Sequence, residues 1–189
     1  MKMRGLTTLV GAAALLLMRG SAVLPADDAG AADHGLEAAV KATYIYKFGP
    51  FVEWPSSAFE TQESPVSLCV VGNAPFGDIL DQAVDGQYIG SHPILVRRMH
   101  IVTGQSGCHI LYAAGSRAQS VSEALEAVHY LPVLTVTNSV RNPEAKGIVH
   151  FVIEDNRVRF EIDDYTASEN GLVISSKVLN LAVAVRSRV

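Results

Sequence analysis

The side chains that could bind a metal or transfer a proton are dispersed along the chain. The six histidines are His34, His92, His100, His109, His129 and His150. They form no H-x-H pair and no H-E-x-x-H motif, the spacings that place two ligands on one face of a strand or helix. We therefore interpret them as surface or strand residues and predict no metal site.

Two glycine-containing turns match catalytic or phosphate-binding loops only in part. Residues 104–107 read G-Q-S-G, which lacks the G-x-S-x-G frame of a nucleophile elbow and precedes a predicted strand instead of following one. Residues 72–77 read G-N-A-P-F-G and lie between a predicted strand and a predicted helix, where nucleotide phosphates bind in Rossmann folds. They lack the G-x-G-x-x-G pattern, and Pro75 removes a backbone donor. The sequence predicts neither an enzyme nor a bound cofactor.

The two cysteines carry the clearest predicted chemistry. Cys69 lies within one apolar run, and Cys108 lies at the entry to another. Neighbouring parallel strands are about 4.8 Å apart, within the Cα separation that a disulfide requires, and exported proteins usually oxidise such pairs. We predict a Cys69–Cys108 disulfide. Two free buried thiols are the alternative; a catalytic thiol is least favoured, because adjacent His109 would face the opposite side of the strand.

The N-terminus has the pattern of a secretory signal peptide. Lys2 and Arg4 precede an uncharged run from Leu6 to Met18, which is shorter than the roughly 20 residues of a membrane span. We predict a signal peptide over residues 1–22, with cleavage between positions 22 and 31, and a disordered leader over residues 23–35. A short buried helix or a one-pass anchor is the alternative. After cleavage we expect no membrane insertion.

Composition limits the remaining possibilities. The chain has 189 residues, of which 49% are hydrophobic and 18% charged, and its formal net charge is −4. A disordered chain would be poorer in apolar residues, and a nucleic-acid binder would show a basic excess. We therefore expect one globular domain over residues 36–189 and no nucleic-acid partner.

The apolar pattern predicts the elements that position these residues. Runs at 66–71, 109–113 and 133–136 are typical of strands buried on both faces. Helical spacing is found at 36–48, 76–83 and 116–129; in the first of these the predicted stripe is Leu36, Ala39, Val40, Thr43, Tyr44 and Lys47, widened by Ile45 and Phe48. Hairpins are predicted within 88–96 and 148–162, and residues 172–185 read as a strand end that runs into a helix. This alternation indicates an α/β domain with a mixed, mostly parallel sheet.

Several motifs resemble one known family. Residues 44–48 and 51–55, Y-I-Y-K-F and F-V-E-W-P, are similar to the opening of the YfiR-like (DUF4154) family. Residues 68–77, 107–112, 147–162 and 172–179 resemble its later segments in register, so the resemblance spans residues 36–182. His150 stands where asparagine is commoner in that family, and residues 49–50, Gly-Pro, depart from its pattern.

The resemblance implies a periplasmic protein with a three-layer, Rossmann-like sandwich. It also implies a non-enzymatic regulator that represses an inner-membrane diguanylate cyclase by binding its periplasmic sensory domain and so lowers cyclic di-GMP and disfavours biofilm. A homodimer is compatible with this function. A periplasmic small-molecule-binding protein with a cleft at the sheet end is the alternative.

Three segments are candidates for contact with a partner. The first is the aromatic segment with Phe51 and Trp54, the second is the hairpin with Glu154, Arg159 and Glu161, and the third is the C-terminal stretch with Ile174 and Leu179. Core packing is the alternative explanation for the first and third segments. Solvation of one sheet face is the alternative for the charged hairpin residues.

Overall fold

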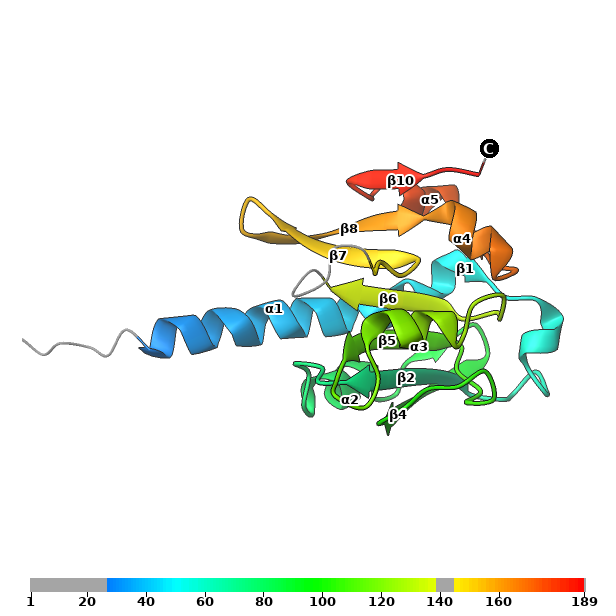
Figure 1. Cartoon of the computed structure of the whole chain (residues 1–189), viewed down its shortest axis with the longest axis horizontal. Coiled ribbons are helices and arrows are strands. Elements are labelled where there is room, and N and C mark those ends of the chain that lie inside the picture. Colours follow the sequence, from blue (N-terminus) through cyan, green and yellow to red (C-terminus); the bar gives the residue numbers. More distant parts are fainter. Residues whose placement is uncertain (1–26, 139–144, 189) are drawn as a thin grey trace, which may run out of the picture.

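The computed structural model describes residues 27–138 and 145–188 and has the topology of an α/β sandwich (Figure 1). The strands are β1 (Val52–Glu53), β2 (Val66–Gly72), β3 (Tyr88–Ile89), β4 (His92–Met99), β5 (Ile110–Gly115), β6 (Leu134–Asn138), β7 (Val149–Glu154), β8 (Arg157–Asp163), β9 (Val173–Ile174) and β10 (Ala184–Arg186). The helices are α1 (Asp27–Lys47), α2 (Ile79–Val84), α3 (Val121–Glu126), α4 (Asp164–Glu169) and α5 (Ser176–Leu179), with 3-10 turns η1 (Gly49–Phe51) and η2 (Ser56–Ala58).

The main sheet has eight strands in the order β10-β8-β7-β6-β5-β2-β4-β3. The pairs β4–β2, β2–β5, β5–β6, β6–β7 and β8–β10 are parallel. The β7–β8 and β3–β4 pairs are antiparallel hairpins. The predicted mixed, mostly parallel sheet with two hairpins is therefore confirmed.

Alternating residues of β2 enter two separate cores, which explains its continuous apolar run. Leu68 and Val70 join a core with α1 and α2 on one face of the sheet. Cys69 and Val71 join a second core with Ala124 and other residues of α3 on the opposite face. Because both faces are covered, the first six residues of β2 are all buried. The three-layer, Rossmann-like prediction is confirmed.

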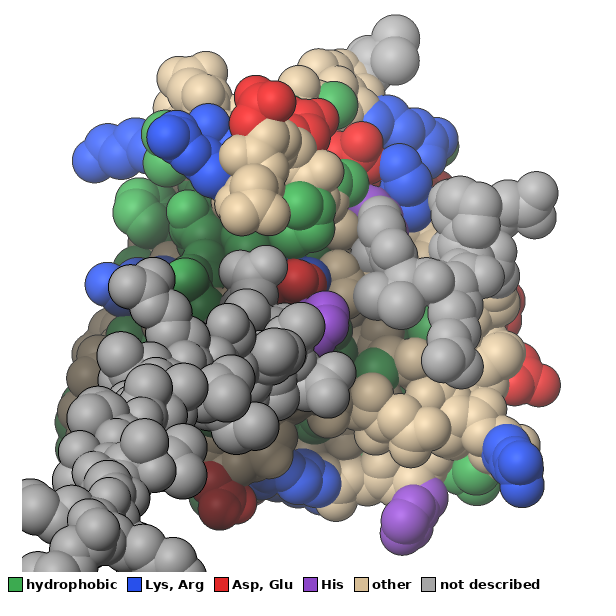
Figure 2. Space-filling model, turned by 90° about the vertical axis from the view of Figure 1, so that its left-hand side faces the viewer, with side chains coloured by type: hydrophobic (Ala, Val, Ile, Leu, Met, Phe, Trp, Pro, Cys, Tyr) green, Lys and Arg blue, Asp and Glu red, His purple; other side chains and the backbone are tan. Residues whose placement is uncertain are grey.

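Helix α1 corrects two predictions. It begins at Asp27, so residues 27–35 are helical, whereas they were predicted to be a disordered leader. Its buried face follows Ala38, Ala42, Ile45 and Phe48, while Leu36 from the predicted stripe is 65% exposed. Small alanines let the helix backbone approach the sheet, and the N-terminal part of α1 extends beyond the sheet (Figure 1). Hydrophobic side chains are exposed on the face from which it projects (Figure 2).

The C-terminal half differs from prediction in two further places. Helix α3 begins after Ser120 rather than at Ser116, because Ser120 and Glu123 form a capping box. Residues 172–185 contain β9 and α5, as predicted in outline, and also the edge strand β10, which was not predicted.

The predicted signal peptide, its cleavage positions up to residue 26 and the first part of the leader lie outside the described residues. Among the helices that the structure does describe, none has the length and apolar character needed to cross a membrane.

Candidate functional site

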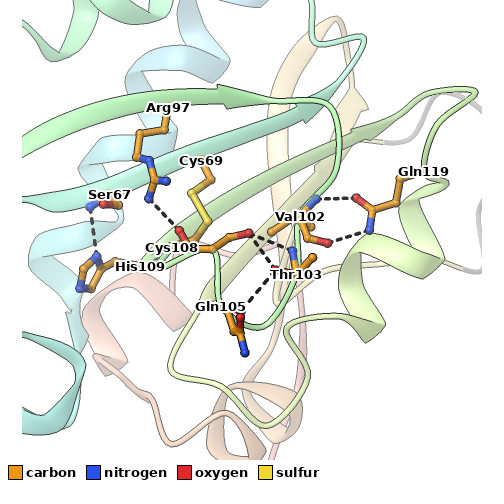
Figure 3. Close-up of a disulfide and its surroundings, with 10 residues drawn as sticks. Ser67, Cys69, Arg97, Val102, Thr103, Gln105, Cys108, His109 and Gln119 are labelled. Atoms are coloured by element: carbon orange, nitrogen blue, oxygen red, sulfur yellow. Dashed lines mark hydrogen bonds between the residues drawn. A yellow bond between two sulfur atoms is a disulfide. The ribbon is translucent and has the colours of Figure 1, made fainter.

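The Cys69–Cys108 disulfide is confirmed and joins two neighbouring strands (Figure 3). Cys69 lies in β2 and Cys108 lies two residues before β5, with their Cα atoms 5.7 Å apart. Both residues are buried in the core beneath α3. The bond therefore fixes the start of β5 against β2, at the centre of the sheet.

Side-chain hydrogen bonds hold the loop that leads into Cys108. The Gln119 side chain accepts from the Val102 backbone N–H at 2.8 Å and donates to the Val102 carbonyl at 2.9 Å. The Ser106 hydroxyl accepts from the Thr103 N–H at 2.9 Å. Arg97 of β4 donates to the Ser106 carbonyl at 2.7 Å. The disulfide and this loop thus form one ordered unit (Figure 3).

A stack of three rings lies next to the disulfide. Phe59 packs face to face between His92, at 4.0 Å between ring centroids, and His109, at 4.4 Å. His109 Nδ1 accepts a hydrogen bond from the Ser67 N–H at 3.0 Å, so its proton is on Nε2, which donates to the Ala58 carbonyl at 2.9 Å. The neutral form of His109 therefore holds the segment after η2 against β2.

This geometry predicts how stability depends on pH. Burial lowers the pKa of His109, with repulsion from His92 adding to the effect and the Ala58 hydrogen bond opposing it. Burial also lowers the pKa of His150. The charge of Lys146 lowers this pKa further, and the charge of Glu161 raises it. Both rings therefore gain protons less readily in the fold than in the unfolded chain. Their stabilising contribution is therefore complete above about pH 6.5, the ordinary histidine value, and decreases as the pH falls below it.

We expect the unfolding free energy to decrease between pH 7 and pH 5, by at most about 1.4 kcal/mol per pH unit for each proton taken up. Urea unfolding at successive pH values measures this slope. In His109→Asn the slope should become shallower, whereas in the exposed control His100→Gln it should stay as in the wild type. An equal slope in the wild type and His109→Asn would contradict the prediction.

The structure brings the first and third predicted segments together. Strands β1 and β9 pair in antiparallel register with Val52 opposite Ile174, and the Ser175 N–H donates to the Phe51 carbonyl at 2.8 Å. Ile174 is buried, while Phe51, Trp54 and Leu179 pack half-buried against the main core. Trp54 also contacts Phe59 edge-on at 6.4 Å between centroids. These four candidate residues are therefore tied to the core, and we do not include them in the candidate surface.

The charged hairpin residues lie elsewhere, on the outward face of β7 and β8. Arg159 pairs in register with Val152, Glu161 with His150 and Glu154 with Arg157. Glu154 and Arg159 are exposed, and Glu161 is half-buried and forms an ion pair of 2.5 Å with Lys146. The opposite side chains of β8, such as Phe160, face α1. The hairpin tip and β1 lie at opposite ends of the molecule (Figure 1).

A groove borders this outward face at the edge of the sheet. Strand β10 pairs directly with β8, with Ala184 opposite Glu161, and a groove of about 330 Å³ is lined by residues of β7, β8 and β10. Its lining includes His150, Glu161, Val185 and Arg186. Val185 is 37% exposed, and Val183 and Leu181 just before it are 42% and 65% exposed. We call Glu161, Val185 and the groove that they line the β8–β10 surface.

Sequence reasoning identified Glu161 but not Val185. The only available signal was the alternation of Leu181, Val183 and Val185 with two alanines, which is short and also compatible with a helix end. The pairing partner of β10 is β8, more than twenty residues earlier, so the strand could not be recognised locally.

A polar cluster is buried where α1 crosses the carboxyl end of β6. Lys41 is 1% exposed, forms an ion pair with Glu37 and donates to Asn138 Oδ1 at 2.8 Å. Burial raises the pKa of Tyr112, as does the charge of Glu37, while a hydrogen bond with Asn138 opposes the shift. Each polar group of Lys41 and Asn138 thus has a partner, which supports a structural role for the cluster.

The cleft expected at the sheet end is small. A cavity of about 250 Å³ lies at the carboxyl ends of β2 and β4, and Gly72, Arg98 and His100 contribute to its lining. Arg98 is already bound by Asp81 at 2.5 and 2.9 Å and by the Gly77 carbonyl at 2.5 Å. Within residues 27–138 and 145–188, no group of three or more His, Cys, Asp or Glu side chains is arranged to hold a metal ion.

Comparison with known proteins gives one match. The model of a family described as YfiR/HmsC-like (DUF4154) matches residues 38–183, which include the disulfide, the ring stack and the β8 part of the β8–β10 surface, and end just before β10. No curated protein matches the chain.

Proposed function

Because the chain belongs to the YfiR/HmsC-like family, whose members are periplasmic regulators of diguanylate cyclase signalling, we propose that it represses an inner-membrane diguanylate cyclase by binding the periplasmic domain of that enzyme. Repression would lower cyclic di-GMP. The protein itself would act by contact rather than by catalysis. We also propose that the signal peptide predicted over residues 1–22 delivers it to the periplasm.

The observation that carries the proposal is the β8–β10 surface, whose β8 strand lies within the region that matches the family and whose β10 strand follows directly after that region. It combines charges of both signs from Glu161, Lys146 and Arg186 with an exposed apolar residue at the sheet edge, Val185, which pairs with Ile162 and so faces the side of the sheet opposite Glu161. Protein interfaces contain both apolar and charged side chains. Strand β10 is also the last strand of the sheet order, so its outer backbone groups are available to a partner strand.

The disulfide supports a further part of the proposal. It fixes β5 to β2 in the same sheet that carries the β8–β10 surface. We propose that only the oxidised protein is competent to repress, because reduction would loosen the centre of this sheet.

A retention experiment tests the proposed contact. The exported protein, immobilised through the N-terminus of its mature chain so that β10 stays accessible, should retain from detergent-solubilised membranes a protein with a periplasmic domain and a cytoplasmic diguanylate cyclase domain. Excess free protein should release it. If mass spectrometry of the retained material finds no diguanylate cyclase above the level on an empty matrix, the proposal is wrong.

A further inference from the structure

A slot with apolar and polar lining residues lies between α1 and the tip of the β7–β8 hairpin. Its volume is about 340 Å³, in the range of small-molecule sites of roughly 300–1,000 Å³. The apolar lining residues are Leu36, Val40, Tyr44, Ile153 and Val158. Leu36 and Ile153 are 65% and 49% exposed, and Figure 2 shows hydrophobic side chains gathered on this face below basic ones. Exposed apolar residues that converge on a cavity indicate a binding site.

Positive charge lies at the rim of the slot. Arg157 and Arg159 contribute to its lining from β8, where they alternate with the α1-facing Val158 and Phe160 and so start from the outward face of the hairpin. Both are exposed, and neither forms an ion pair with a carboxylate in the part of the chain that the structure describes. The carboxylate of Glu37, which also lines the slot, is paired with Lys41. The slot therefore presents two cations that a bound anion could neutralise, in a chain whose net charge is −4.

The shape of the slot limits the kind of ligand. Tyr44 is one of its lining residues, and the Tyr44 ring packs against Phe151 at 6.2 Å and Phe160 at 5.8 Å between centroids. Leu36 and Tyr44 are two helical turns apart on α1, which corresponds to about 12 Å. A partner helix about 10 Å wide would need more volume than this. A single flexible chain fits the available space better.

We propose that this α1–hairpin slot binds a single-chain anionic amphiphile of the fatty-acid class. The apolar chain lies along Leu36, Val40, Ile153 and Val158 and ends at Tyr44. The carboxylate head binds Arg157 and Arg159 at the rim, because guanidinium groups donate paired hydrogen bonds to carboxylates. This activity is independent of cyclase repression and of the β8–β10 surface.

Titration calorimetry of the purified exported protein with dodecanoate, below the concentration at which it forms micelles, tests the proposal. We expect saturable binding at one site. Dodecyl maltoside and dodecyltrimethylammonium have the same chain with a neutral and a cationic head, and we expect each to bind at least tenfold more weakly. Equal affinity for the three heads would overturn the proposal, as would the absence of dodecanoate binding.

Two variants locate the site. The double variant Arg157→Gln/Arg159→Gln should bind dodecanoate about 100-fold more weakly, about tenfold for each charge-assisted hydrogen bond lost. Val40→Phe, at a half-buried position, should abolish binding by filling the slot. The matched control is the exposed Arg117→Gln, which should bind as the wild type does. Because Arg157 and Arg159 are both exposed, the double variant should keep the wild-type melting temperature. If the double variant bound dodecanoate as tightly as the wild type does, the slot would not be the binding site.

Discussion

Removal of the disulfide by Cys69→Ala/Cys108→Ala is expected to lower the free energy of unfolding by about 4 kcal/mol. The bond closes a loop between residues 39 positions apart, and in the chain-entropy model a loop of that length restricts the unfolded chain by about this amount. Loss of two buried sulfur atoms from the core beneath α3 adds to the effect. The melting temperature should fall by about 10 °C, since about 1 kcal/mol corresponds to 2–4 °C in a domain of this size.

The wild-type protein under reducing conditions provides the matched control. If the constraint on the unfolded chain is the main cause, reduced wild type and the double variant should melt within a few degrees of each other, and oxidised wild type well above both. A melting temperature in the double variant equal to that of oxidised wild type would contradict the stabilising role of the bond.

The double variant Glu161→Arg/Val185→Asp is expected to weaken binding to the cyclase by about 100-fold and to abolish repression. Val185→Asp would bury an unpaired carboxylate in the interface, and Glu161→Arg would place like charge beside Lys146 and Arg186. Both side chains are partly exposed, so we expect little loss of fold stability. Cyclic di-GMP in a strain that carries only this variant should equal that of a strain without the gene.

A matched variant at the opposite edge of the sheet controls for surface charge. Glu63 and Tyr88 are both exposed, and Tyr88 lies in β3, the other terminal strand of the sheet order. Glu63→Arg/Tyr88→Asp introduces the same new side chains and should repress as the wild type does. Full repression by Glu161→Arg/Val185→Asp would exclude the β8–β10 surface as the contact site.

Local sequence pattern was sufficient for the centre of the sheet and for the hairpin. The uninterrupted run in β2 indicated a strand covered on both faces, and the alternation of β8 separated Arg159 and Glu161 from the core residue Phe160. These features depend only on neighbouring residues. The disulfide was also predictable, because both cysteines lay at apolar runs that parallel topology makes adjacent.

Features that depend on distant residues could not be predicted. Lys41 is buried because Asn138, 97 residues later, accepts its hydrogen bond, so the helical pattern alone misassigned the buried face of α1. The stack of Phe59 on His92 and His109 joins three segments of the chain. Val185 became a candidate only once β10 was seen beside β8.

Cyclic di-GMP in cells that lack the gene is the most direct measurement of the central claim. If the protein represses a membrane diguanylate cyclase, deletion should raise the cellular level several-fold, and the wild-type gene supplied in trans should restore it. Deletion of the cyclase in the same strain should remove the increase. An unchanged level of cyclic di-GMP after deletion, in conditions where the protein is exported and oxidised, would contradict the account.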